Sequence, residues 1–264
     1  MRSEDDMTDQ TPSHPDLDGA SVFITGGGSG IGAKLTEAFL RQGAKVAFIG
    51  RSDYSGFCDE MEQATGTRPL FLQGDVTDTA RLREAIDTAA REHGGLDVLV
   101  NNAANDMRFK TPEITEDDWN DQIAVNLGHQ FFAAQHAANA MKGAGTKGRI
   151  VNYTSIVWMS ASPGMLPYET SKAGIVGLTR ALARDYGEAG IRVNAIAPGM
   201  ILTERQLKDW VTDESKERML GKQCLKVELK PEDMVGPTLF LASDASRAMT
   251  GQCLVADGGV VFAP

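Results

Sequence analysis

Short apolar segments that alternate with longer stretches of helical character constrain the fold of this chain more than any other feature of its sequence. From Ser21 onward there are seven such segments, and most of the stretches between them are long enough for a crossover helix. Several are almost continuously apolar, as expected for strands buried on both faces. The pattern predicts a single-domain, doubly wound α/β fold: a seven-stranded parallel sheet with helices on both faces. The segments are SVFITG, KVAFIG, PLFLQGDV, DVLVNNA, RIVNYTS, RVNAIAPG and CLVADGG.

A glycine-rich turn follows the first segment. In TGGGSGIG, Gly26, Gly30 and Gly32 are spaced G-x-x-x-G-x-G, and the helical pattern AKLTEAFLRQG begins at once. Glycine lets the backbone turn tightly and approach a pyrophosphate, which then lies at a helix N-terminus where amide groups and the helix dipole favour negative charge. A glycine turn alone is weak evidence, but its position between a strand and a helix predicts a dinucleotide site.

The end of the second segment indicates which dinucleotide binds. An acidic residue there would bind the ribose 2′-hydroxyl of NAD, whereas an arginine would accommodate the 2′-phosphate of NADP. The sequence reads VAFIGRSD, so Gly50 takes the acidic position and Arg51 follows. Because a guanidinium makes paired hydrogen bonds to phosphate, we expect NADP. Alternatively, Arg51 stacks on adenine or is simply solvated, and Asp53 leaves NAD possible.

Asp75 ends the third segment, in the sequence GDV. Its carboxylate is placed to accept a hydrogen bond from the adenine amino group. Alternatively, it caps the helix that begins near Asp78.

A tyrosine and a lysine lie four residues apart in YETSK, where Tyr168 and Lys172 share one face of a predicted helix. Ser155, thirteen residues before the tyrosine, ends the strand segment RIVNYTS. Asn126, in AVNLGHQ, falls in the middle of another predicted helix, where asparagine competes with the backbone for hydrogen bonds. Together with the glycine turn, these four residues form a specific pattern.

The pattern resembles the short-chain dehydrogenase/reductase family from about Ser21 to the C-terminus, through the stretches TGGGSGIG, DVLVNNAA, VNL, YTS, YETSK and APGMILT. The resemblance implies a Rossmann fold, a nicotinamide cofactor and a catalytic tetrad of Asn126, Ser155, Tyr168 and Lys172. Ala104 departs from the glycine that the family usually has there, which adds a methyl group near the nicotinamide ribose. The residues that the resemblance places around the cofactor are Gly26, Ser29, Gly30, Ile31, Gly32, Arg51, Ser52, Asp75, Val76, Asn101, Asn102, Ala103, Tyr168, Lys172, Pro198, Gly199, Ile201 and Thr203.

The chemistry of a hydroxyl oxidation explains the residue types of this tetrad. Tyrosine has a reference pKa of about 10, too high for a base at neutral pH, but a nearby lysine ammonium and a nicotinamide cation favour the phenolate. Tyr168 then takes the proton of a substrate hydroxyl, or returns it when a carbonyl is reduced. By the resemblance, Ser155 holds the same oxygen, Lys172 also binds the ribose, and Asn126 orders a water that links the lysine to solvent.

A finer resemblance is to bacterial xylose and related sugar 1-dehydrogenases. It rests on NDMR, SIVW, YETSKAGI, TERQLKDW and QCLK, and it implies oxidation of an aldose at its anomeric carbon to a lactone. A pyranose needs several hydrogen-bond partners and one flat apolar surface. Glu169 is alternatively a first-turn carboxylate at a helix N-terminus, and Trp210 alternatively packs a lid. The candidate substrate residues are Asn105, Asp106, Arg108, Ser155, Trp158, Glu169, Gln206 and Trp210.

Two other functions compete with sugar oxidation. A member of the same family could reduce an oxoacyl, steroid or xenobiotic ketone, although NDMRFK and SIVWMS predict a more polar site entrance than such substrates favour. A non-catalytic dinucleotide sensor is less consistent with an intact tetrad, because a sensor needs no proton relay.

Composition excludes several classes of partner. The net charge of −10, with no block of Lys and Arg, argues against binding to nucleic acid or to an anionic membrane. The chain has no apolar run long enough to span a membrane, and its start lacks the apolar core of a signal peptide. Three widely spaced cysteines, Cys58, Cys224 and Cys253, fit a reducing cytoplasm better than a disulfide framework, and we expect no metal site.

The sequence also suggests boundaries and assembly. Residues 1–18 are predicted to be a disordered polar tail, and residues 19–264 the catalytic domain. Residues 201–230 are charged and amphipathic and are placed to cover the site as a lid, or else form a plain surface helical hairpin. Surplus apolar and small residues in the helices around Asn126 and Tyr168, together with the resemblance, predict a homodimer or homotetramer. The C-terminal VVFAP is a candidate for a second interface.

Overall fold

A parallel sheet forms the centre of the computed structural model, which describes residues 12–262. Its strands follow the order β3-β2-β1-β4-β5-β6-β7, and every neighbouring pair is parallel. This arrangement confirms the predicted doubly wound, seven-stranded sheet. The strands are β1 (Ser21–Thr25), β2 (Lys45–Gly50), β3 (Leu70–Gln73), β4 (Val98–Asn101), β5 (Arg149–Tyr153), β6 (Arg192–Pro198) and β7 (Cys253–Ala256).

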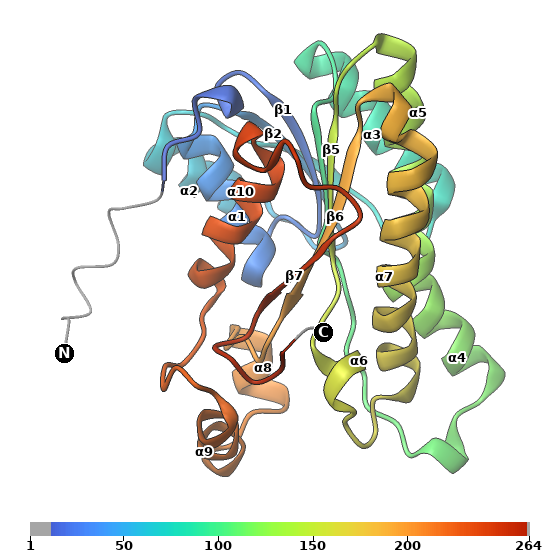
Figure 1. Cartoon of the computed structure of the whole chain (residues 1–264). Coiled ribbons are helices and arrows are strands. Elements are labelled where there is room, and N and C mark those ends of the chain that lie inside the picture. Colours follow the sequence, from blue (N-terminus) through green and yellow to red (C-terminus); the bar gives the residue numbers. More distant parts are fainter. Residues whose placement is uncertain (1–11, 263–264) are drawn as a thin grey trace.

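Helices cover both faces of the sheet, as Figure 1 shows with the sheet nearly edge-on. Helices α1 (Gly30–Arg41), α2 (Ser55–Thr65) and α10 (Val235–Ala242) lie on one side. Helices α3 (Thr79–His93), α5 (His129–Ala144) and α7 (Leu166–Tyr186) lie on the other. A hydrophobic core lies on each face of the sheet. Successive residues of β1 pack into opposite cores, because the side chains of a strand point alternately to its two faces. Val22 and Ile24 pack with α1 and α10, whereas Phe23 packs with α3 and α5.

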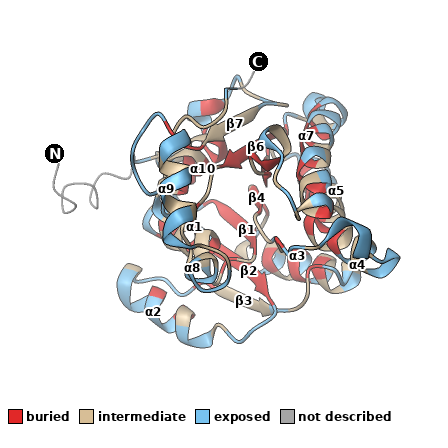
Figure 2. Ribbon diagram, turned by 90° about the horizontal axis from the view of Figure 1, so that it is seen from below, coloured by how far each residue is buried: buried red, intermediate tan, exposed pale blue. Residues whose placement is uncertain are grey.

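The carboxyl ends of the strands meet at one edge of the sheet, where three short helices gather. These are α6 (Val157–Ser160), α8 (Glu204–Asp209) and α9 (Asp213–Lys222). Figure 2 looks onto this edge and shows buried residues concentrated in the strands and on the sheet-facing sides of the helices. Helices α8 and α9 make up much of the segment 201–230, for which the sequence predicts a lid or a surface helical hairpin.

Helix α4 (Glu116–Ile123) runs into α5 through a short π-helical segment, Ala124–Gly128. The sequence predicts one regular helix here, and the local change from α to π geometry is not visible in the residue pattern. Asn126 lies inside this segment. A π-bulge commonly marks a functional site, because it turns side chains and backbone groups away from their regular positions.

The ordered domain begins earlier than residue 19. Residues Pro15–Leu17 form a 3₁₀ turn, and the side chain of Leu17 is fully buried in the core that contains α1. The Asp16 carboxylate accepts hydrogen bonds from Arg149 and from the backbone of Asp244. The predicted boundary at residue 18 is therefore wrong for residues 15–18, while residues 1–11 lie outside the described part of the chain.

Among residues 12–262, no helix is both long and apolar enough to cross a membrane.

Candidate active site

An open cavity of about 1090 Å³ lies at the carboxyl edge of the sheet. Its wall runs from the glycine turn and the ends of β2 and β3, past β4 and β5, to α7 and the segment that contains α8 and α9. Open α/β sheets bind ligands at this edge, next to the point where the strand order reverses between β1 and β4. No group of three or more His, Cys, Asp or Glu residues in the described chain is placed to hold a metal ion.

The glycine turn has the backbone geometry that its sequence predicts. Gly26 and Gly30 have φ angles of 71° and 53°, a region that disfavours other residues. A Cβ atom on Gly32 would overlap the carbonyl oxygen of Gly26, so this glycine allows helix α1 to start close against the turn. The Asn102 amide donates to the carbonyl oxygens of Thr25 and Gly26, at 3.2 and 3.1 Å, and holds the turn from the end of β4.

The N-terminus of α1 faces the cavity. Ser29 is the N-cap residue, but its side chain makes no capping hydrogen bond. The first amide groups of an α-helix have no partner within the helix, and Ser29, Gly30 and Ile31 line the cavity wall. Thr203 lies across from them, in van der Waals distance of the position that a Cβ on Gly30 would take. This end of the cavity can therefore accept an anionic group such as a pyrophosphate.

Arg51 and Asp75 lie together at the far end of the cavity, just after the ends of β2 and β3. Their guanidinium and carboxylate groups are 3.9 Å apart, and the Arg51 side chain is 76% exposed. Asp75 also accepts hydrogen bonds from the backbone and hydroxyl of Thr77, while Asp78 caps helix α3. Asp53 does not line the cavity, and the pKa of its exposed carboxyl is lowered by the hydrogen bond from the backbone of Ser55.

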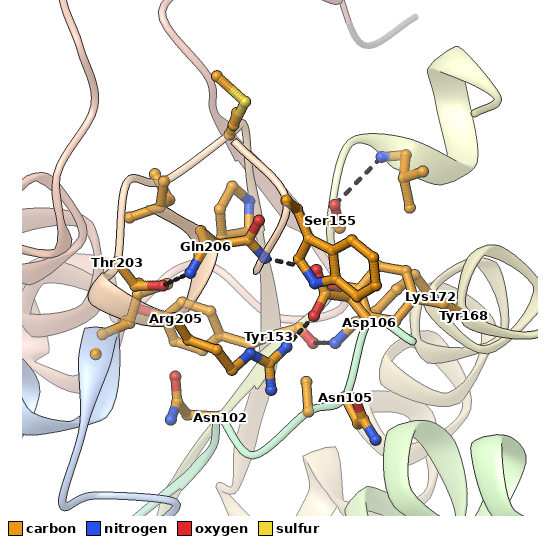
Figure 3. A pocket seen from close by; sticks show the side chains of 18 of the residues that line it. Asn102, Asn105, Asp106, Tyr153, Ser155, Tyr168, Lys172, Thr203, Arg205 and Gln206 are labelled. Atoms are coloured by element: carbon orange, nitrogen blue, oxygen red, sulfur yellow. Dashed lines mark hydrogen bonds and ion pairs between the residues drawn. The ribbon is translucent and has the colours of Figure 1, made fainter. Parts of the chain in front are cut away.

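Tyr168 and Lys172 face the cavity from α7, and Ser155 faces it from the loop after β5 (Figure 3). The Lys172 side chain is 1% exposed, and its ammonium donates a 2.9 Å hydrogen bond to the carbonyl oxygen of Tyr153. The same ammonium lies 5.2 Å from the centre of the Tyr168 ring. One buried lysine thus joins α7 to the end of β5 beside the Tyr168 ring.

Burial dominates the protonation of this pair. Desolvation raises the pKa of Tyr168 to about 12, an effect opposed by a hydrogen bond with Ser155. Desolvation also lowers the pKa of Lys172 to about 7. The sequence predicts a lowered pKa for Tyr168, because a nearby ammonium attracts the phenolate. In the chain alone the opposite holds, because burial disfavours the charged form of each group.

Asn126 does not line the cavity but binds a residue that does, Asn105. The Asn126 side chain is fully buried, accepts a hydrogen bond from the backbone N–H of Asn105 and donates to the carbonyl oxygen of the same residue, both at 2.9 Å. It also donates to Gln122. The π-helical segment thereby fixes the loop that follows β4.

That loop meets α8 across the remaining part of the cavity. Asp106, which is 7% exposed, accepts hydrogen bonds from Arg205 and from the amide of Gln206 (Figure 3). The Arg108 guanidinium lies over the Trp210 ring, 4.8 Å from its centre. Two separate contacts therefore connect the loop 105–108 with α8 and its end.

The structure brings most of the predicted site residues into the cavity wall, but five lie outside it. Gly32 packs against Gly26, and Asn101 is buried beneath the wall, where it donates to Gln130 and Asn152. Glu169 accepts a 3.3 Å hydrogen bond from the backbone of Ser162. The other two are Asn126, described above, and Trp158. The predicted residues that do line the wall are Gly26, Ser29, Gly30, Ile31, Arg51, Ser52, Asp75, Val76, Asn102, Ala103, Asn105, Asp106, Arg108, Ser155, Tyr168, Lys172, Pro198, Gly199, Ile201, Thr203, Gln206 and Trp210.

Three contributors to the site were missed from the sequence. The Tyr153 carbonyl binds Lys172, and the Thr154 hydroxyl donates a 2.6 Å hydrogen bond to the Lys172 carbonyl, although both precede Ser155 in the YTS stretch. Arg205 directly precedes the predicted Gln206. A backbone carbonyl that accepts a hydrogen bond cannot be recognised from residue identity. The charge of Arg205 is visible in the sequence, but the sequence does not show that Asp106 is its partner.

The residues present fit an extended dinucleotide. One end of the cavity offers Arg51 and Asp75, its middle offers the glycine turn with unpaired helix amides, and its other end offers Tyr168 and Lys172. A cofactor with a pyrophosphate between two nucleosides needs these three kinds of contact in this order.

Comparisons with known proteins agree with this geometry. The family model described as enoyl-(acyl carrier protein) reductase matches residues 26–261. A protein named as a galactose dehydrogenase from Rhizobium meliloti (strain 1021) is 48% identical over 96% of this chain and 100% of its own length. A D-xylose 1-dehydrogenase from Caulobacter vibrioides is 43% identical over 93% of this chain and 97% of its own. A 3-oxoacyl-[acyl-carrier-protein] reductase from Thermotoga maritima is 35% identical over 93% and 99%.

Solved structures are similar over the whole domain. A protein described as a short-chain alcohol dehydrogenase from Sinorhizobium meliloti 1021 superposes with a TM-score of 0.88 at 36% identity, covering 93% of this chain and 98% of its own. A protein described as a gluconate dehydrogenase from Agrobacterium tumefaciens has the same TM-score at 30% identity, covering 96% and 100%.

The burial of Lys172 predicts a pH-dependent effect of Lys172→Met on stability. Between the lowered folded pKa of about 7 and the ordinary value of 10.5, the unfolded chain binds more protons than the folded one, so the contribution of Lys172 to stability rises with pH. The stability of Lys172→Met relative to the wild type should therefore fall by about 2 kcal/mol from pH 7 to pH 9. Urea unfolding at several pH values measures this difference. Lys208→Met, at an exposed lysine of α8, is the control and should show a flat difference; a flat difference for Lys172→Met as well would contradict the burial argument.

Proposed function

The chain belongs to the short-chain dehydrogenase/reductase family, and on that premise we propose that it oxidises the anomeric C1 hydroxyl of an aldose to a lactone. As a member of this family it is an NAD(P)-dependent oxidoreductase. The observation that carries the proposal is the arrangement of Ser155, Tyr168 and Lys172 at the carboxyl edge of the sheet, opposite a polar cavity wall.

In the proposed reaction, Tyr168 removes the proton of the C1 hydroxyl while Ser155 binds the same oxygen. The C–H bond at C1 breaks, its electron pair leaves with the hydrogen as hydride, and the C1–O bond becomes a carbonyl. The bound nicotinamide supplies the hydride acceptor. Because burial raises the pKa of Tyr168 to about 12, its action as a base requires positive charge nearby, and Lys172 lies 5.2 Å from its ring. Water then opens the lactone.

The character of the wall near Tyr168 supports a sugar substrate. Asn105, Asp106, Arg108 and Gln206 bring polar groups to this part of the cavity. Trp210 brings a flat apolar ring, one face of which lies against the Arg108 guanidinium. A pyranose has hydroxyl groups around its edge and C–H groups on its faces, which match such a lining. Relatives above 40% identity are named as a galactose dehydrogenase and as D-xylose 1-dehydrogenases, which points the same way.

Reduction of an oxoacyl substrate is the second candidate function. It is favoured by the description of the matching family model and by the oxoacyl reductase among the relatives. An acyl chain would need an apolar channel next to Tyr168, whereas this side of the cavity holds Asp106, Arg108 and Arg205. We therefore prefer the sugar, and initial rates with aldoses and with a 3-oxoacyl thioester discriminate the two candidates.

We further propose NADP as the preferred cofactor, a cytoplasmic location and self-association through α4, α5 and α7. The last is supported by the small and apolar residues of these helices, and light scattering that finds only monomer at micromolar concentration would contradict it. Closure of the segment 201–230 over the bound sugar is part of the same proposal.

Tyr168→Phe tests the catalytic proposal. It removes one hydroxyl and should lower kcat by about 10²–10⁴, the contribution of general acid–base catalysis, while the Tm and the cofactor Kd stay near their wild-type values. Tyr186→Phe is a matched control, because Tyr186 does not line the cavity and its hydroxyl donates to Asn139 of α5. Tyr168→Phe that folds, binds cofactor and turns over at a near-normal rate would refute the assigned base.

Arg51→Ala tests the cofactor. If Arg51 binds the 2′-phosphate, this change should reduce kcat/KM for NADP by about tenfold or more, as loss of a charge-assisted hydrogen bond costs about 1.5–3 kcal/mol, and should change kcat/KM for NAD little. Arg91→Ala, at an exposed position of α3, is the control. An equal loss for both cofactors would indicate stacking on adenine instead.

A further inference from the structure

Asp106 occupies a position that its expected role as a direct sugar contact does not explain. Its side chain is 9% exposed, and both of its carboxylate oxygens already have partners in the lid helix α8. Oδ1 accepts from Arg205, and Oδ2 accepts from the Gln206 amide nitrogen at 2.5 Å. These contacts join residues about a hundred positions apart in the chain, so they depend on the fold and not on local sequence.

The contact with Asp106 fixes the orientation of the Gln206 amide. An ionised carboxylate accepts hydrogen bonds only, so the NH₂ side of the amide must face it. The Gln206 backbone is held as well, because its N–H donates to the Thr203 hydroxyl and its carbonyl accepts from Trp210 and Val211. With both the backbone and the NH₂ group fixed, the carbonyl oxygen of Gln206, Oε1, is turned away from Asp106 (Figure 3), and Gln206 lines the cavity wall. Within residues 12–262, Oε1 has no hydrogen-bond partner.

We propose that Asp106 is a positioning residue that sets substrate specificity: it makes Gln206 an acceptor that selects a hydrogen-bond donor on the substrate. This inference rests on the proposed function, in which the donor is a hydroxyl of the aldose away from C1. A group that accepts but cannot donate, such as a fluorine or an ether oxygen, would face the Gln206 oxygen with no hydrogen between them. A site that leaves a polar group unpaired in this way rejects the analogue.

Asp106→Asn should reverse this preference. Arg205 is a charged donor, so the new amide would turn its oxygen toward Arg205 and its NH₂ group toward Gln206. Gln206 would then rotate its own amide to accept from Asn at position 106, and its NH₂ group would face the cavity. The substitution changes a single atom of the side chain, yet it converts the acceptor that faces the substrate into a donor.

Deoxyfluoro sugars measure this preference directly. D-galactose and D-xylose are compared with their analogues that carry fluorine at C2, C3 or C4, and kcat/KM is measured for the wild type and for Asp106→Asn. At one position the wild type should prefer the hydroxyl by at least about tenfold, and Asp106→Asn should lose most of that preference. The inductive effect of fluorine is common to both proteins and cancels in the ratio of their preferences.

Gln206→Met provides a second variant that leaves the pair of Asp106 and Arg205 in place. It should lose the same preference at the same position, with its Tm and cofactor Kd near the wild-type values. Asp209→Asn, an identical change at an exposed carboxylate of α8, is the control and should keep the wild-type preference.

The outcomes separate this inference from the proposed function. If the wild type oxidises an aldose but Asp106→Asn or Gln206→Met keeps the full preference for hydroxyl over fluorine at every position, the inference is wrong and the proposed function stands. If the wild type oxidises none of the sugars, the proposed function fails and the inference fails with it.

Discussion

The hydrogen bond from the buried Lys172 ammonium to the Tyr153 carbonyl is the interaction on which the site depends most. It joins α7 to the carboxyl end of β5, and Thr154 adds a second bond to the Lys172 backbone. Tyr168, one helical turn earlier, is thereby held beside Ser155 at the sheet edge. Burial of the lysine costs free energy, because it disfavours the charged ammonium, and it brings the pKa of Lys172 to about 7.

On the other side of the cavity, a series of contacts leads from the π-helical segment to α8. The π-helical segment presents Asn126, which binds both backbone groups of Asn105 and so fixes the loop after β4. That loop places Asp106 and Arg108, which hold α8 and Trp210 in turn. The residues that line this side of the cavity thus depend on the buried Asn126, which lies outside the cavity wall.

Much of the fold could be predicted from the sequence, because strand periodicity, glycine turns and the Tyr168 and Lys172 spacing are local signals. The missed features depend on distant partners. The pairing of Asp106 with Arg205 crosses 99 residues, and burial of Leu17 depends on a core formed by later segments. Asn101 and Asn102 are adjacent, but only the second faces the cavity, since side chains alternate along a strand. The pKa of Tyr168 depends on the balance between burial and attraction to positive charge, and burial cannot be judged without the surrounding packing.

The central claim is that the fold uses Ser155, Tyr168 and Lys172 to remove hydride from C1 of an aldose. Its most direct test is oxidation of galactose and xylose labelled with deuterium at C1, followed by mass spectrometry of both products. The claim predicts that the reduced cofactor gains one deuterium and that the lactone, or the acid formed from it, retains none. Recovery of the deuterium in the sugar product, with an unlabelled reduced cofactor, would show oxidation at another carbon and contradict the claim.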